Sequence, residues 1–169
     1  MANIEQQEDF LSVIESTKGI IYKVANTFYK DAEDRKGLIQ EISIKIWNSF
    51  DSYRKEFKHS TWIYRIALNT AISFYRKEKS RKIRNVPYTE GIFNIADFQN
   101  NSQIEQGAFI LSKFISELKE LDRALILLCL EERSHREISE IIGISETNVS
   151  TKISRIKSIL KQKFSQTSI

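Results

Sequence analysis

The sequence has few of the residues that interrupt helices. Its 169 residues include one proline, Pro87, and five glycines. Proline and glycine are the residues least compatible with a helix interior, so their scarcity favours a chain that is helical throughout. Composition therefore predicts an all-α fold, and the length suits one ordinary domain or two small ones.

Cysteine and histidine are also scarce, which excludes several kinds of site. The single cysteine, Cys129, has no intramolecular partner for a disulfide. It lies in the apolar run 125–130, where we expect a small buried side chain. Two histidines and one cysteine that lie far apart offer no zinc-binding spacing. We therefore predict no metal site and no cofactor.

The sequence also lacks long apolar runs and a strong net charge. No stretch approaches the roughly 20 apolar residues that cross a bilayer, and the polar first eight residues do not resemble a signal peptide. We therefore expect a cytoplasmic protein without membrane insertion. The net charge is only +4, but residues 76–84 hold six basic residues and one acidic residue. Such a block can contact phosphates, although a solvated helix end is an alternative.

The clearest pattern that is present lies between Ser134 and Leu160. Ser134 and Glu137 have the spacing of a capping box, Gly143 can form a turn, and Ser145 can cap a second helix. Apolar residues follow at helical spacings of four, three and four. They are Val149, Ile153, Ile156 and Leu160. The pattern predicts a helix-turn-helix.

The opposite face of that second helix is small, polar and basic, which suits a helix that enters a DNA major groove. A plain helical hairpin is the alternative, but its solvated face would more often carry Glu and Lys. We therefore predict DNA contacts from this face. The predicted residues are Thr147, Asn148, Ser150, Thr151, Lys152, Ser154 and Arg155.

A change of composition separates this unit from the first half of the chain. Residues 86–103 contain Pro87, Gly91 and the polar run 99–103, without a sustained helical stripe. We interpret them as a flexible linker between two small helical domains. The predicted domains cover residues 8–85 and 104–164, and helices are expected near 105–117 and 121–131 ahead of the helix-turn-helix.

The first domain has three apolar stripes with helical spacing, separated by polar junctions. The expected elements are a helix from Phe10 to Phe28 that Gly19 interrupts, a helix capped within 31–34 that runs to Trp47, a loop over 48–58, and a long helix capped by Ser60 or Thr61. The expected core residues are Trp47, Trp62, Ile63, Ile66 and Phe74, whereas Tyr64 and Leu68 should point elsewhere.

Residues 51–84 interleave aromatic side chains with cations. Proteins that hold unpaired DNA combine these two types, because bases stack on rings and cations follow the phosphates. Arg65, Asn69 and Arg76 share a second face of the long helix, near Ser73, and Lys77 follows Arg76 in the basic block. We predict that Arg65, Asn69, Arg76 and Lys77 contact DNA.

Three separated motifs occur in an order that resembles bacterial RNA polymerase sigma factors of the extracytoplasmic function type. Such proteins keep only sigma regions two and four, joined by a linker, so the resemblance covers nearly the whole chain. The motifs are Leu38-Ile39-Gln40-Glu41 followed by Ile42, Ile46 and Trp47, then the run from Ser60 to Ala71, and then Leu121-Asp122-Arg123 ahead of the helix-turn-helix.

The resemblance implies a function and a set of contacts. A sigma factor directs core RNA polymerase to promoters and initiates transcription. Expected partners are core polymerase, promoter DNA as duplex and as melted non-template strand, and an anti-sigma factor. For polymerase docking, the resemblance implies Leu38, Ile39, Gln40 and Glu41. For the melted −10 element, it implies Arg65 and Asn69, with residues 51–59 holding a flipped base. For the −35 element, it implies Ser150, Thr151, Ser154 and Arg155, with Lys152 on a phosphate.

Three positions depart from the family pattern. Gly37 replaces the usual Asp before the docking motif, which removes a charge and loosens that helix. His59 stands where Phe is common, and Ser150 stands where Lys or Arg is frequent.

The residues alone leave two other functions open. A free-standing helix-turn-helix regulator would explain residues 134–160 but would leave the aromatic and basic first half without a role. A nuclease would need clustered carboxylates for metal ions. Asp31, Glu33 and Asp34 are adjacent, but they stand at a helix start, where acids are common. We predict that the protein is not an enzyme.

Overall fold

The computed structural model describes residues 2–53, 56–85 and 103–167. The predicted all-α class is confirmed, since every element in those ranges is a helix. The first group comprises α1 (Ala2–Phe28), α2 (Ala32–Ser49), the short 3-10 helix η1 (Phe50–Ser52) and α3 (His59–Asn85). The second group comprises α4 (Gln103–Ser116), α5 (Glu120–Leu130), α6 (His135–Ile142) and α7 (Glu146–Gln166).

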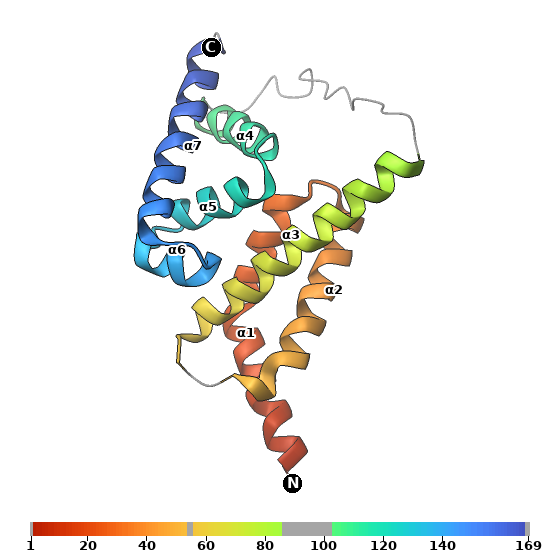
Figure 1. Ribbon diagram of the computed structural model, residues 1–169. Coiled ribbons are helices and arrows are strands. Elements are labelled where there is room, and N and C mark those ends of the chain that lie inside the picture. Colours follow the sequence, from red (N-terminus) through yellow and green to blue (C-terminus); the bar gives the residue numbers. More distant parts are fainter. Residues whose placement is uncertain (1, 54–55, 86–102, 168–169) are drawn as a thin grey trace.

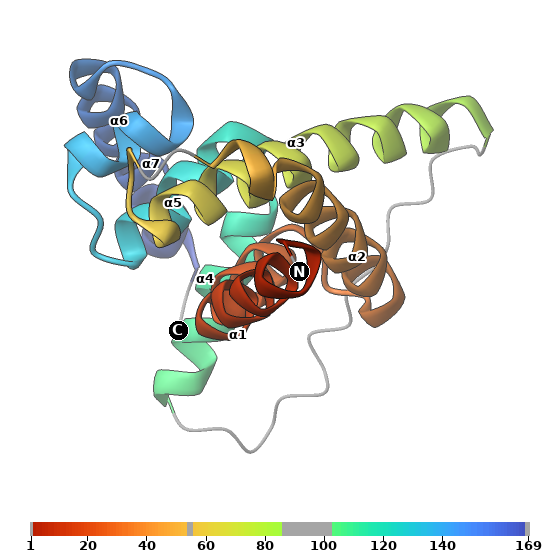
Figure 2. The same ribbon diagram turned by 90° about the horizontal axis from the view of Figure 1, so that it is seen from below.

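The helices form two bundles that lie side by side (Figures 1 and 2). In the first bundle, α1, α2 and α3 all pack on one another. In the second, α5, α6 and α7 pack together and α4 covers α5 and α7. The bundles meet where α6 and α5 lie against α3 and where α5 and α4 lie against α1. The helix α3 is therefore central, with neighbours from both halves of the chain.

Local chemistry fixes the ends of several helices as predicted. The carboxylate of Asp31 accepts hydrogen bonds from the backbone amides of Glu33 and Asp34, which caps α2. Ser134 and Glu137 form the predicted capping box at the start of α6. Ser145 caps α7 by accepting a hydrogen bond from the amide of Asn148.

Other predicted boundaries are wrong. The helix α1 continues through Gly19, an exposed position that costs helix stability without breaking the helix. The helix α3 begins at His59, so Ser60 and Thr61 lie in its first turn and neither precedes it as a cap. The predicted loop 48–58 is partly helical, because α2 continues to Ser49 and η1 follows.

Several burial predictions also need correction. Trp47 is 43% exposed, and Trp62, Ile66 and Phe74 are half-buried against the core, whereas Ile63 is fully buried. Tyr64 and Leu68, predicted to point elsewhere, are 1% and 0% exposed. Packing between distant segments contributes to this burial, because α3 packs on α1, α2, α5 and α6 and the guanidinium of Arg133 lies 5.2 Å from the centre of the Tyr64 ring. Cys129 is half-buried rather than fully enclosed.

The predicted linker lies almost entirely outside the described residues. Only its last residue, Gln103, is described, and it begins α4. At the other end of the chain, α7 runs two residues past the predicted domain end at 164. Within the described ranges, no helix combines the length and apolarity needed to cross a bilayer.

Candidate nucleic-acid interface

The helix α7 presents the predicted polar face to solvent. Val149, Ile153, Ile156 and Leu160 are buried beneath it, so the fold of this helix depends on one stripe only. Six of the seven predicted contact residues are exposed, and Lys152 is half-buried. The hydroxyl of Thr151 donates to the carbonyl of Thr147 over 3.0 Å, which leaves the oxygen of Thr151 able to accept a hydrogen bond.

The turn before α7 sets the direction of this face. Gly143 has a φ of 83°, in the left-handed region that a side chain with a Cβ atom rarely adopts. The hydroxyl of Ser139 donates to the carbonyl of Ile144 over 2.6 Å and closes the turn from the α6 side. Because the amide of Gly143 also bonds to the carbonyl of Ser139, the angle between α6 and α7 is fixed by local hydrogen bonds.

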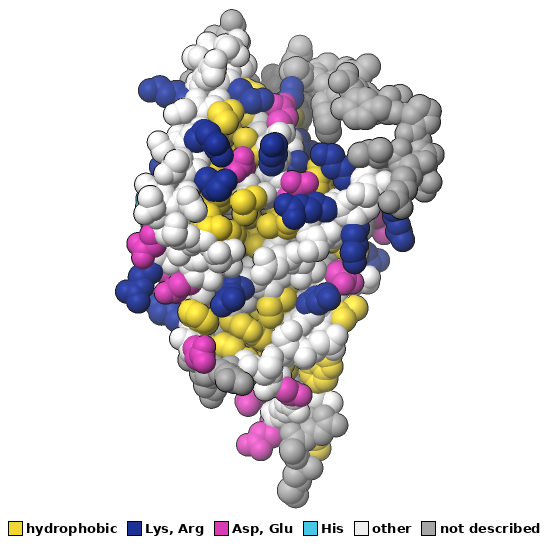
Figure 3. Space-filling view, viewed as in Figure 1, with side chains coloured by type: hydrophobic (Ala, Val, Ile, Leu, Met, Phe, Trp, Pro, Cys, Tyr) yellow, Lys and Arg dark blue, Asp and Glu magenta, His cyan; other side chains and the backbone are white. Residues whose placement is uncertain are grey.

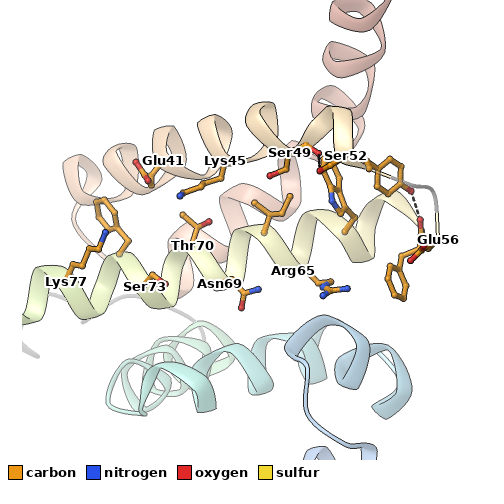
Figure 4. A pocket seen from close by; sticks show the side chains of 15 residues that line it. Glu41, Lys45, Ser49, Ser52, Glu56, Arg65, Asn69, Thr70, Ser73 and Lys77 are labelled. Atoms are coloured by element: carbon orange, nitrogen blue, oxygen red, sulfur yellow. Dashed lines mark hydrogen bonds between the residues drawn. The ribbon is translucent and has the colours of Figure 1, made fainter.

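A second candidate surface is a groove of about 750 Å³ between α2 and α3, with walls from both helices and from the segment that joins them (Figure 4). Three predicted DNA contacts, Arg65, Asn69 and Lys77, line it. The fourth, Arg76, is exposed on α3 outside the groove lining. The other lining residues are Glu41, Lys45, Ser49, Ser52, Tyr53, Glu56, Phe57, Trp62, Ile66, Thr70, Ser73 and Phe74.

Aromatic rings gather at one end of this groove. The rings of Tyr53 and Trp62 have centroids 4.7 Å apart, and the ring of His59 lies 5.0 Å beyond Tyr53. The hydroxyl of Tyr53 donates to the carbonyl of Phe57, so these two groove residues between η1 and α3 are joined by a hydrogen bond. The guanidinium of Arg65 lies 5.4 Å from the centre of the Phe57 ring. These flat surfaces beside cations are what an unpaired base and its phosphates require.

The contribution of α2 to this groove is not predicted by the sequence. Lys45 lies one helical turn after Glu41, so both side chains share the face of α2 that looks toward α3 (Figure 4). The i, i+4 spacing is visible in the sequence, but the neighbour that this face meets is not. Glu41, predicted to dock on polymerase, therefore lines the groove instead of the outer side of α2.

The other predicted docking residues are not grouped on one exposed face. Leu38 is 0% exposed, so it cannot touch a partner in this fold and instead anchors α2 in the core. Ile39 is half-buried against the same core, and Gln40 is exposed. The exposed apolar residues near Gln40 on α2 are Ile44 at 54% and Trp47 at 43%. The ring of Phe10 from α1 packs edge-on against Trp47 with centroids 4.7 Å apart.

The charges near these surfaces are mostly basic. Lys and Arg side chains lie over the far half of α3 and over the α4 and α7 side of the second bundle, with apolar patches between them (Figure 3). The basic residues of α3 from Arg76 to Lys82 are exposed. The acidic residue Glu78 lies between these basic residues and already has two partners. It accepts a hydrogen bond from the hydroxyl of Tyr29 and pairs with Lys82 at 3.5 Å. Burial and this hydrogen bond raise the pKa of Tyr29.

The acidic residues that a nuclease would need do not form a metal site in the described ranges. Asp31 is engaged as the cap of α2, and burial beside Glu78 raises the pKa of Asp34. No group of three or more potential ligand side chains gathers among the residues that the structure describes.

Known families match both bundles. The Sigma-70 region 2 family matches residues 13–81, and the Sigma-70 region 4 family matches residues 108–160. Among curated proteins, the chain is 28% identical to the ECF RNA polymerase sigma factor SigW of Bacillus subtilis over 166 residues, which cover 92% of this chain and 89% of SigW. It is 32% identical to the RNA polymerase sigma factor SigZ of the same organism over 126 residues, covering 74% and 69% of the two chains.

Solved structures share the fold. The structure of CnrH in complex with the cytosolic domain of CnrY has a TM-score of 0.67 at 18% identity and covers 96% of this chain and 91% of that one. The sigma factor RpoE in complex with the anti-sigma factor NepR from Bartonella quintana has a TM-score of 0.65 at 17% identity, covering 96% and 98%.

Proposed function

This chain belongs to the RNA polymerase sigma factors of the extracytoplasmic function type, which direct core polymerase to promoters, and on that premise we propose which of its surfaces carry each contact. The observation that carries the proposal is that one chain holds two separate surfaces whose chemistry suits DNA. The polar face of α7 suits duplex, and the aromatic groove between α2 and α3 suits an unpaired strand. A free-standing regulator would use the first surface only.

We assign reading of the −35 duplex to the exposed side chains of α7. Arg155 can form a bidentate contact with guanine, and Asn148 can do so with adenine. The hydroxyls of Ser150, Thr151 and Ser154 are short enough to let the helix approach the base edges closely. Lys152 is half-buried beside them, which suits a phosphate contact better than a base contact.

We assign the melted −10 strand to the groove. Extruding a base from the duplex costs a few kcal/mol. Stacking on an aromatic ring returns about 1–3 kcal/mol per base, so the rings of Tyr53, Phe57 and Trp62 can offset that cost. Arg65 and Lys77 are well separated along the α3 side of the lining and can follow the phosphates, with Asn69 between them for a base edge.

We assign polymerase docking to the outer side of α2. Gln40, Ile44 and Trp47 follow one another at spacings of four and three, so they share one stripe, and all three are exposed. Two large apolar side chains on a stripe that faces solvent are typical of a protein-binding surface. This stripe shares Gln40 with the predicted docking residues Leu38, Ile39, Gln40 and Glu41.

The two DNA contacts gain strength from being joined. Each small domain has a short footprint, and linking both on one polymerase raises their joint affinity through effective concentration. We infer that the protein acts by binding in the cytoplasm, without a reaction of its own. We also infer that an anti-sigma factor can oppose it, because the similar sigma factor RpoE is found in complex with the anti-sigma factor NepR.

Transcription by reconstituted holoenzyme tests this function. Core polymerase mixed with the chain should co-elute in gel filtration and should initiate RNA synthesis from a subset of a random promoter library. Trp47→Ala should weaken co-elution, whereas Arg155→Ala should leave co-elution unchanged and reduce initiation. Tight DNA binding by the chain without co-elution would instead favour the free-standing regulator.

A further inference from the structure

Aromatic side chains from four elements of the first bundle form a continuous row. Neighbouring rings in this row have centroids between 4.7 and 6.2 Å apart. The rings come from the start of α1, the end of α2, η1 with the residue after it, and the start of α3, which meet at one end of the bundle (Figure 1). In order, this aromatic row consists of Trp47, Phe10, Phe50, Trp62, Tyr53 and His59.

The two ends of the aromatic row belong to the two surfaces of the first bundle assigned above. Trp47 is part of the docking stripe on the outer side of α2 and is 43% exposed. Tyr53 and Trp62 line the groove, at the end where an unpaired base can stack. The docking stripe and the groove lining share no residue. They are nevertheless connected by rings that pack on one another.

Phe10 is the ring through which this connection passes. It is half-buried and meets the ring of Trp47 at 83°, with centroids 4.7 Å apart. It also meets the ring of Phe50 at 86° and 5.5 Å. Edge-to-face pairs have a preferred geometry, because the positive edge of one ring meets the negative face of the other. A side chain that takes part in two such pairs restricts the orientation of both neighbours.

Phe50 extends this restriction to the groove. Its ring lies 6.2 Å from that of Trp62, which lies 4.7 Å from that of Tyr53 at an interplanar angle of 38°. The carbonyl of Phe50 also accepts a hydrogen bond from the amide of Tyr53 over 3.1 Å, which closes η1. A base that stacks on these rings needs them in a fixed position. Phe50 therefore places them through packing and through the backbone.

We propose that Phe10 is a positioning residue for both surfaces, although it belongs to neither. It holds the Trp47 ring in the docking stripe and, through Phe50, it holds the rings that stack an unpaired base. The inference rests on the function proposed above, because it uses the assignment of polymerase to α2 and of the melted strand to the groove. A purely structural Phe10 would affect stability alone, whereas a positioning residue affects two separate binding reactions.

Tryptophan emission of the full chain tests whether Phe10 positions Trp47. The sequence has two tryptophans, so Trp62→Phe leaves Trp47 as the reporter. In that background, Phe10→Leu keeps an apolar side chain but removes the ring. It should shift the emission of Trp47 to longer wavelength and increase its quenching by acrylamide. Phe10→Tyr retains the ring and should leave both properties unchanged. An unchanged emission in Phe10→Leu would overturn the positioning of Trp47.

Two binding measurements test the consequences in an otherwise wild-type chain. Phe10→Leu should weaken binding to core polymerase. It should also weaken binding of holoenzyme, formed with saturating chain, to a labelled single strand from a promoter selected in the random library. Each loss should be about 2- to 10-fold, because one aromatic pair limits the contribution of Phe10. Phe10→Tyr should restore both affinities, whereas Phe50→Leu should weaken strand binding only.

Val13→Ala is the matched control for stability. Val13 is 8% exposed, lies one helical turn after Phe10 and is outside the aromatic row. Its truncation should lower the midpoint of thermal unfolding and leave both affinities unchanged. Equal losses of affinity in Val13→Ala and Phe10→Leu would show general destabilisation and overturn the inference.

The outcomes also separate this inference from the proposed function. Wild-type affinities in Phe10→Leu would overturn the positioning role while leaving the sigma function intact. Failure of the wild-type chain to bind core polymerase would instead count against the proposed function, and the emission of Trp47 would still decide whether Phe10 positions that ring.

Discussion

The two helices to which we assign DNA contacts differ in how many of their faces are covered. One stripe of α7 is buried against its own bundle, and most of its other residues are exposed. By contrast, α3 has one stripe against α1 and α2 and another against the second bundle. A helix with one partner keeps the simple apolar and polar pattern that a sequence reveals. A helix with two partners has a wider apolar surface, and the helices next to it in the chain bury only one part of that surface.

The largest expected effect comes from removing a buried side chain of each helix. Ile156→Ala in α7 and Leu68→Ala in α3 should each cost about 2–5 kcal/mol of unfolding free energy, since both positions are fully buried. Both tryptophans, Trp47 and Trp62, lie in the first bundle. Urea unfolding of Ile156→Ala should therefore shift the circular dichroism transition more than the tryptophan fluorescence transition, whereas Leu68→Ala should shift both.

A fluorescence shift in Ile156→Ala as large as its circular dichroism shift would contradict this difference. It would mean that the two bundles unfold as one unit and that the contact on α3 is as strong as either core. Leu128→Ala, at another fully buried position of the second bundle, is the control that should behave like Ile156→Ala.

Effects of intermediate size are expected on DNA binding, and substitutions in α7 and in α3 should affect binding to different forms of DNA. Arg155→Ala should cost the holoenzyme about 1–3 kcal/mol of affinity for a −35 duplex if it makes a bidentate base contact. Asn69→Ala should instead reduce binding to a melted −10 strand and leave polymerase binding intact. Fluorescence anisotropy with the two DNA forms measures both effects.

The control on α7 is Ser158→Ala, an exposed hydroxyl that bonds back to the carbonyl of Ser154 and lies outside the predicted contact set. A uniform loss for Arg155→Ala across DNA sequences would show that this residue contacts phosphate. Unchanged transcription with Asn69→Ala would remove Asn69 from the base-reading residues.

Smaller effects on stability are expected at two glycines, and the two effects should have opposite signs. Gly143→Ala should destabilise the second bundle by about 1–2 kcal/mol, because its φ of 83° disfavours a Cβ atom. Gly19→Ala should stabilise the chain by up to about 1 kcal/mol, since Gly19 is helical and an added Cβ atom would meet nothing within 4 Å. Thermal unfolding followed by circular dichroism measures both, and a destabilising Gly19→Ala would imply a break in α1 that the structure lacks.

The smallest effect concerns pH. The backbone amide and hydroxyl of Ser134 hold the pKa of Glu137 below its ordinary value of 4.5. A depressed pKa in the folded state means that this stabilisation is present above about pH 4.5 and is lost as the pH falls through the folded value. Glu137→Gln should therefore lose stability less steeply between pH 5 and 3 in chemical unfolding. The difference should be under about 1 kcal/mol because the side chain is partly exposed. An identical pH slope in both proteins would exclude this contribution.

The parts of the fold that sequence predicts correctly are those fixed by neighbours in the chain. The capping box at Ser134, the turn at Gly143, the cap at Ser145 and the stripe from Val149 to Leu160 all depend on residues a few positions apart. The helices α4 and α5 fall close to the predicted ranges for the same reason. Helix periodicity and capping are local physics, so the sequence contains them directly.

The parts that sequence predicts wrongly depend on packing between distant segments. Trp47 is large and aromatic, which favours a core position, but its helix turns it toward solvent beside Phe10. Tyr64 and Leu68 lie off the predicted core stripe but are buried, and Tyr64 meets Arg133 of the second bundle. The groove requires the pairing of α2 with α3, so Lys45 is not predicted although Arg65 and Asn69 are. Residues 86–102 fall outside the described ranges, so the predicted linker stays a prediction.

The residues of α7 that stabilise the fold differ from those that face solvent, and this difference affects how the protein can evolve. Its buried stripe and its capping serine secure the helix, while its outward hydroxyls and amide secure nothing else in the fold. Under the −35 assignment proposed above, we therefore expect substitutions at Asn148, Ser150 or Ser154 to alter sequence preference at little cost in stability. A duplicated copy could acquire new target genes through such exchanges while keeping its attachment to the same polymerase.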